Sequence, residues 1–105
     1  MIKHTYRHAK GPTGSAQAEF VEITLWIEPK RVGEDTSFED LSNTPGVNTE
    51  WMLGLGSGAM RAASELGDAP YHISVIQIRF LEVDASPSAF EAAGYGCVKA
   101  ALSPQ

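Results

Sequence analysis

The segment "EFVEITLWIEP" at residues 19–29 is the feature that most limits what this chain can fold into. Valine, isoleucine or leucine occupies every second position from 21 to 27, and most intervening positions are polar or charged. Because successive side chains of a β-strand point to opposite faces, this pattern is typical of a strand with one buried face. A single strand cannot bury that face alone, so the rest of the chain must supply further strands and covering helices.

Three other segments alternate in a similar way and predict the remaining strands of a sheet. Residues 2–8 alternate polar and apolar side chains, and residues 36–42 form a short third candidate. Residues 71–83 carry apolar side chains on both faces over part of their length, which favours a strand inside the sheet. The alternation continues through Glu82 and Asp84, so the pattern predicts almost no loop before the next element.

Two segments show apolar residues at the helical spacing of three and four. The first covers residues 48–66, with Asn48 or Thr49 as its capping residue. The second covers residues 87–102; Ser86 caps it, and a proline occupies the first helical position, where its missing N–H costs nothing. The resulting order of three strands, helix, strand and helix predicts an α/β (α+β) two-layer sandwich. Both helices are expected on one face of a mixed four-stranded sheet.

The bulk properties set limits on size, partners and location. A chain of 105 residues predicts a single domain over residues 1–105, with a disordered tail at 102–105. The formal net charge of −5 argues against broad binding to nucleic acids or anionic membranes, although a local basic patch can override the total. No apolar stretch approaches the ~20 residues of a membrane span, and the N-terminus has no hydrophobic signal region. We therefore expect a cytoplasmic protein without a membrane partner.

The sequence "GLGSGA" at residues 54–59 matches the glycine pattern of dinucleotide-binding proteins. That motif needs a strand immediately before it, so that a tight turn opens a helix onto the pyrophosphate. Here the preceding residues already belong to the predicted helix. We therefore interpret Gly54, Gly58 and Ala62, spaced four apart, as a smooth ridge that can approach the sheet closely, and we expect no cofactor.

His4 and His8 suggest a shared metal ion only if they lie on a helix. On the predicted strand their spacing separates them by ~13 Å, at ~3.3 Å per residue, whereas a zinc ion holds each ligand at ~2 Å. His72 could join one of them from a neighbouring strand, but no carboxylate or cysteine pattern completes a site. The sequence therefore predicts no metal site.

No pattern of catalytic residues is complete. Ser57 lies in Gly-Ser-Gly rather than in a nucleophile elbow, and no strand precedes it. Glu82 and Asp84 share a predicted strand face, which suits a solvated edge as well as an acid–base pair. Residues 10–14, "KGPTG", lack the Gly-Lys-Ser/Thr ending of a phosphate loop. We therefore expect no catalytic residues and no enzyme activity.

Three short stretches follow one another along the chain in a specific order and spacing. They are Ile-Glu-Pro at 27–29, Gly-Ala-Met-Arg at 58–61 with a closing Gly67, and Val-Asp-Ala-Ser at 83–86 with Ala-Phe at 89–90. Together they resemble domain IV of elongation factor G and of the related ribosomal-protection proteins, here as a free-standing single domain. The resemblance implies the same order of elements, with a left-handed crossover. It also implies a rigid, non-catalytic arm whose tip loops reach into the decoding region of the small ribosomal subunit.

This sequence departs from the family pattern at both tip loops. Residues 9–18 lack the family's basic, glycine-rich stretch, and Lys10 is the only basic residue there. The last strand runs directly into Val-Asp, without the histidine-bearing turn of the family. The resemblance therefore implies that the framework is kept while the loops that probe the ribosome are reduced. The candidate contacts that remain with RNA or at the tip are Lys3, Arg7, His8, Lys10, Thr13 and Gln17.

Two functions stay open at this point. One is a non-catalytic module that binds the small ribosomal subunit or RNA weakly through the remaining loops. The other is a module that binds another protein, or a second copy of itself as a homodimer, through the sheet face or an exposed edge strand. Phe20 and Trp26 fall on the polar face of residues 19–29, and exposed aromatic side chains there suit a protein interface. Stacking on single-stranded RNA is the poorer choice because carboxylates lie nearby.

Overall fold

The computed structural model describes residues 1–12 and 18–103. Its strands and helices follow the predicted order, with one short turn added. The elements are β1 (Ile2–Lys10), β2 (Glu19–Pro29), β3 (Ser37–Asp40), α1 (Thr49–Glu65), β4 (Tyr71–Phe80), the 3-10 turn η1 (Glu82–Asp84) and α2 (Pro87–Leu102). The predicted two-layer α/β sandwich is confirmed.

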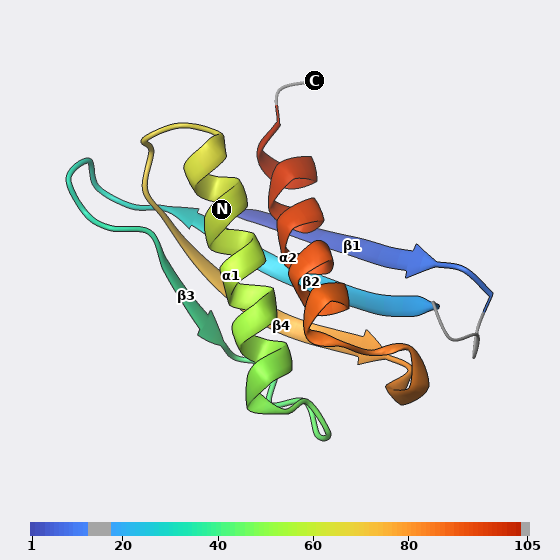
Figure 1. Cartoon of the computed structure of the whole chain (residues 1–105). Coiled ribbons are helices and arrows are strands. Elements are labelled where there is room, and N and C mark those ends of the chain that lie inside the picture. The colour runs from blue at the N-terminus through green and yellow to red at the C-terminus, as the bar shows by residue number, and fades with distance from the viewer. Residues whose placement is uncertain (13–17, 104–105) are drawn as a thin grey trace.

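The four strands form one mixed sheet in the order β1-β2-β4-β3. β1 and β4 run antiparallel to β2, and β3 runs parallel to β4. Both helices cover the same face of the sheet (Figure 1). The chain leaves β3, crosses that face as α1 and returns as β4 in a left-handed connection (Figure 1), whereas about 98% of such connections are right-handed. The resemblance implied this exception, which no pattern in the sequence predicts.

The core lies between the helices and the apolar face of β2. Val21, Ile23 and Leu25 are fully buried on that face, as the alternation predicted. The helices and β4 supply the other large buried side chains, among them Leu55, Ile73, Val75, Phe90, Cys97 and Val98. The opposite face of the sheet carries the polar residues of the same strands and has no helix over it (Figure 1). We call this second surface the open face.

The apolar residues on both faces of β4 have a local cause. The register between β2 and β4 shifts between Thr24 and Leu25, so Ile76 is an extra residue on β4. A bulge of this kind reverses the alternation of the side chains that follow it. As a result Val75 and Ile78, which an unbroken strand would point to opposite faces, are both buried against the helices.

The junction between β4 and α2 differs from the strand predicted at residues 71–83. β4 ends at Phe80, and η1 follows. Glu82 and Asp84 therefore do not share a strand face: Glu82 is exposed, whereas Asp84 is only 2% exposed. The prediction was wrong here because the chain must change direction before Ser86, whose side chain caps the first turn of α2.

The lengths of the two helices bear on two expectations from the sequence. α2 continues to Leu102, which packs against the core, so the expected tail at 102–105 does not include that residue. Ser103 is the C-cap, and residues 104–105 lie outside the described residues. In the part of the chain that the structure describes, no helix is long and apolar enough to cross a membrane.

The small-residue ridge of α1 faces α2 rather than the sheet. A Cβ atom at Gly58 would lie 2.1 Å from the carbonyl oxygen of Glu91. In the reverse direction, a Cβ atom at Gly94 would lie 2.2 Å from the carbonyl oxygen of Leu55. The expected contact with the sheet was therefore wrong: glycines on both helices let the two helix backbones touch each other. The ridge lies inside α1 with helix before it, as its interpretation as a packing motif requires.

Candidate functional site

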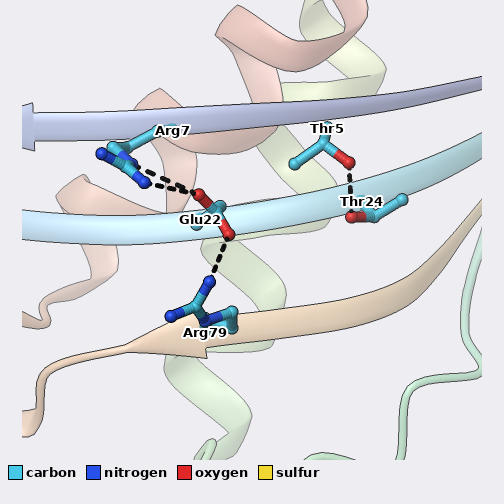
Figure 2. Close-up of polar contacts among 5 residues, drawn as sticks. All are labelled: Thr5, Arg7, Glu22, Thr24 and Arg79. Atoms are coloured by element: carbon cyan, nitrogen blue, oxygen red, sulfur yellow. Dashed lines mark hydrogen bonds and ion pairs between the residues drawn. The ribbon is translucent and has the colours of Figure 1, made fainter.

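The side chains of the open face form ordered polar contacts across the strands. The hydroxyl groups of Thr5 on β1 and Thr24 on β2 share a hydrogen bond of 2.8 Å. Glu22 on β2 forms ion pairs with Arg7 on β1 and with Arg79 on β4, each at 3.2 Å (Figure 2). Two guanidinium groups on one carboxylate leave net positive charge and unused N–H donors at this part of the surface.

Phe20 and Trp26, the predicted interface residues, both lie on the open face but do not form one patch. Phe20 is half-buried, and the guanidinium carbon of Arg7 lies 5.6 Å from the centre of its ring. Trp26 is 38% exposed and lies opposite Lys3 of β1. The two aromatic residues are separated by about 20 Å along β2, at ~3.3 Å per residue. The open face therefore presents Trp26 as its main exposed aromatic side chain.

His72 joins β4 to β3 at the end of the open face remote from Arg79. Its Nδ1 atom lies 2.6 Å from Ser37 Oγ, and its Nε2 atom lies 2.8 Å from Glu39 Oε1. Serine, histidine and carboxylate in series resemble a hydrolase triad. Here, however, Ser37 is the register partner of His72, and the three side chains lie on an open, solvated surface. We interpret them as cross-strand contacts that stabilise the pairing of β3.

The sequence left open that His72 joins His4 or His8 at one site, and the structure does not bring them together. β2 separates β1 from β4, so His72 does not join His4 or His8. Among the described residues, no group of three or more histidine, cysteine, aspartate or glutamate side chains could hold a metal ion. Cys97 is fully buried, and burial raises the pKa of its thiol to about 12, so it packs as a neutral thiol at pH 7.

The second candidate region is the end of the sheet where β1 finishes and β2 begins, which we call the loop end. Glu19 is central to it: its carboxylate lies 2.8 Å from His8 Nε2 and accepts a hydrogen bond of 3.2 Å from the hydroxyl of Ser88 on α2. The hydrogen bond with His8 holds the pKa of Glu19 below its ordinary value. The end of β4 and η1 lie at this same end of the molecule (Figure 1).

The residues predicted to contact RNA do not converge at the loop end. Lys10 and His8 lie there. Lys3 lies at the opposite end of β1, and Arg7 projects onto the open face toward Glu22 (Figure 2). The last two, Thr13 and Gln17, lie outside the described residues. What the four described candidates share is strand β1, which has no acidic residue.

The pairing of Glu22 with Arg79 was not predicted from the sequence. The two residues are 57 positions apart and meet because β2 and β4 are paired in this particular register. The alternation places each of them on a polar strand face, which is the only signal that the sequence carries. The bulge at Ile76 shifts the register between β2 and β4 by one residue. A regular antiparallel register that starts from Pro29 and Tyr71 would therefore not place Glu22 opposite Arg79.

The lowered pKa of Glu19 leads to a prediction about stability. A carboxylate with a depressed pKa stabilises the folded state above its unfolded pKa, and this stabilisation is lost as the pH falls. We expect Glu19→Gln to lower the free energy of unfolding by about 1 kcal/mol at pH 7, and by progressively less as the pH falls through the lowered pKa of Glu19. Urea unfolding across this pH range measures the difference. Ser88→Ala, which keeps the contact with His8, should retain most of the pH dependence; an unchanged pH profile in Glu19→Gln would contradict the prediction.

The comparison with known sequences shows similarity to one group of proteins. No protein-family model matches the chain. The chain is 32% identical over 103 residues to elongation factor G of Ruegeria sp. (strain TM1040), a match that covers 93% of this chain and 14% of the relative. It is 33% identical over 98 residues to elongation factor G of Jannaschia sp. (strain CCS1), covering 89% of this chain and 14% of that relative. The chain thus spans a small part of the curated relatives that it matches.

The comparison with solved structures concerns the fold. A protein of Thermus thermophilus, known from its crystal structure, superposes with a TM-score of 0.77 at 20% sequence identity. The match covers 95% of this chain and 15% of the other. At this level of identity the likeness shows a shared fold. Together with the sequence matches, it confirms the resemblance found in the sequence.

Proposed function

Because this chain is an elongation factor G domain IV-like domain, we propose that it is a non-catalytic, translation-factor-like module of the cytoplasm. In this proposal it associates weakly with the RNA of the small ribosomal subunit, through the loop end and the cations of β1. The similarity to elongation factor G supports the translation context.

The observation that carries this proposal is the concentration of positive charge on β1. Lys3, Arg7 and Lys10 lie on this strand, which has no acidic residue, within a chain of net charge −5. Binding to RNA depends largely on the number of phosphates that cations neutralise. Glu22 already pairs with Arg7, so few cations remain for phosphate. We therefore expect binding that is weak and sensitive to salt.

Sedimentation of the purified protein with small ribosomal subunits tests this proposal. With two or three phosphate contacts, we expect the affinity to fall roughly tenfold to fortyfold between about 50 and 200 mM salt. Lys10→Gln should weaken binding and reduce the salt dependence. Arg31→Gln is the matched control, because this exposed residue lies in the turn after β2, away from the loop end. Tight co-sedimentation that resists salt, or an equal loss in both variants, would contradict the role of the loop end.

A second candidate function is supported by Trp26. A tryptophan that is 38% exposed on a sheet face without a covering helix is typical of the centre of a protein interface. If the protein does not bind ribosomal subunits even at low salt, this alternative gains support. Sedimentation equilibrium then tests self-association: Trp26→Ala should convert a dimer to a monomer, whereas Phe20→Ala, on the half-buried ring beside Arg7, should not.

A further inference from the structure

We propose that the outer edge of β1 accepts an extended, acidic segment of another protein as a fifth strand of the sheet. β1 is an outermost strand of the described sheet, so the backbone groups on its outer side pair with none of the other described strands. It is nine residues long, whereas β3 at the other edge has four. This surface shares the cations of β1 with the contact with RNA proposed above, but it also uses the backbone N–H and C=O groups along the outer edge of β1, which that contact does not need.

The edge of β1 lacks most of the features that prevent strand addition. Its register with β2 is continuous from Ile2 to Lys10, without a bulge, and the strand contains no proline. Native edges are usually protected by bulges, prolines, short length or charged side chains. Of these four features β1 has only charged side chains, and its lysine and arginine residues are all cationic. A regular edge protected by cations alone repels another cationic strand and attracts an anionic one.

The charges on β1 therefore select the partner. If two copies of β1 paired with each other, Lys3, Arg7 and Lys10 would meet only neutral or cationic residues, and like charges on paired strands destabilise a sheet. An acidic strand would instead place carboxylates beside these cations. Lys3 and Lys10 form no ion pair with any described residue, and Arg7 remains 61% exposed beside Glu22. Lys3 and Lys10 are therefore available to a partner, and Arg7 keeps N–H donors that its ion pair with Glu22 does not use.

The alternation along β1 defines which positions of the partner should be acidic. Thr5 and Arg7 point to the open face (Figure 2). The alternation along the strand places Lys3 on the same face, and Ile2 and Tyr6 on the side of the helices. Tyr6 packs against α2 at Gly96, and Ile2 is exposed. A segment that alternates acidic and apolar residues would place its carboxylates near Lys3 and Arg7 and its apolar side chains beside Ile2 and Tyr6.

A synthetic peptide of alternating glutamate and valine, with both ends capped, tests the proposal at low salt. We expect saturable binding in fluorescence anisotropy and slower hydrogen exchange at alternate amides of β1. Lys3→Glu should weaken binding roughly fivefold to thirtyfold, because it replaces a favourable cross-strand pair by a repulsive one. Arg31→Glu, the same charge change on an exposed residue away from this edge, should leave the affinity unchanged. No saturable binding, or an equal loss in both variants, would overturn the proposal.

Backbone methylation of the peptide separates strand addition from attraction of charge alone. Only alternate N–H groups of an added strand point toward β1. Methylating either all glutamate or all valine amides keeps the charge, and one of these two peptides should lose binding while the other retains it. Equal binding by both methylated peptides, or binding of a lysine–valine peptide with the same affinity, would overturn the proposal.

Discussion

Gly58→Ala is expected to lower the free energy of unfolding by about 3 kcal/mol and the melting temperature by roughly 15 °C. Alanine normally stabilises a helix by ~1 kcal/mol relative to glycine. At this position its Cβ atom would lie 2.1 Å from the carbonyl oxygen of Glu91 and 3.0 Å from the amide nitrogen of Tyr95. Because both neighbours belong to the backbone of α2, the helices must move apart, and the loss of packing outweighs the gain in propensity. Thermal unfolding followed by circular dichroism measures the change.

The reciprocal glycine on α2 gives this prediction a sharper form. Gly94→Ala should be destabilising for the same reason, since its Cβ atom would lie 2.2 Å from the carbonyl oxygen of Leu55. Once one substitution has separated the helices, the second should add little, so the double variant should lose clearly less than the sum of the two single losses. Ser57→Ala, at the exposed neighbouring position of α1, is the control and should be neutral or slightly stabilising. A Gly58→Ala variant as stable as the parent would show that the helices do not touch here.

The elements that could be predicted from the sequence are those determined by local patterns. β2 follows from the alternation of its side chains, and both helices follow from helical spacing and from their caps. The side chains of Asn48 and Ser86 each accept a hydrogen bond from the backbone N–H of the residue three positions later. The end of β4 could not be predicted in this way. Glu82 and Asp84 continue the alternation, but their conformation depends on where α2 must begin and on the burial of Asp84.

The candidate sites were less predictable because they depend on which strands are neighbours. The sequence placed Phe20 and Trp26 on the open face but did not indicate that Arg7 lies beside Phe20. The two arginines meet Glu22 only through the order β1-β2-β4 and the bulge at Ile76. The ridge of α1 was recognised from its spacing, yet the spacing of small residues does not reveal whether a helix or a sheet packs against them.

Phe90→Ala is expected to lower the free energy of unfolding by about 3–5 kcal/mol, which is a large part of the ~5–15 kcal/mol typical of a small domain. Phe90 is fully buried and stacks on Trp51, with 5.5 Å between ring centres and 13° between ring planes. Phe80, the last residue of β4, completes the cluster at 6.1 Å from Phe90. The side chain of Phe90 therefore joins both helices to the end of β4. Its removal leaves a cavity among α1, α2 and β4, which the three elements cannot fill by moving closer to one another.

Two comparison variants show which property of Phe90 sets the loss. One separates the loss of side-chain volume from the loss of ring stacking, and the other tests whether the loss depends on burial rather than on the residue type. Phe90→Leu keeps most of the volume and should lose only about 1–2 kcal/mol, the part that depends on contacts between rings. Phe20→Ala makes the same change on the open face, where the ring is half-buried beside Arg7, and should lose about 1 kcal/mol. Urea unfolding of the three variants measures this order. If Phe90→Ala and Phe20→Ala lost equal stability, the cluster formed by Trp51, Phe80 and Phe90 would not be the contact that holds the helices on the sheet.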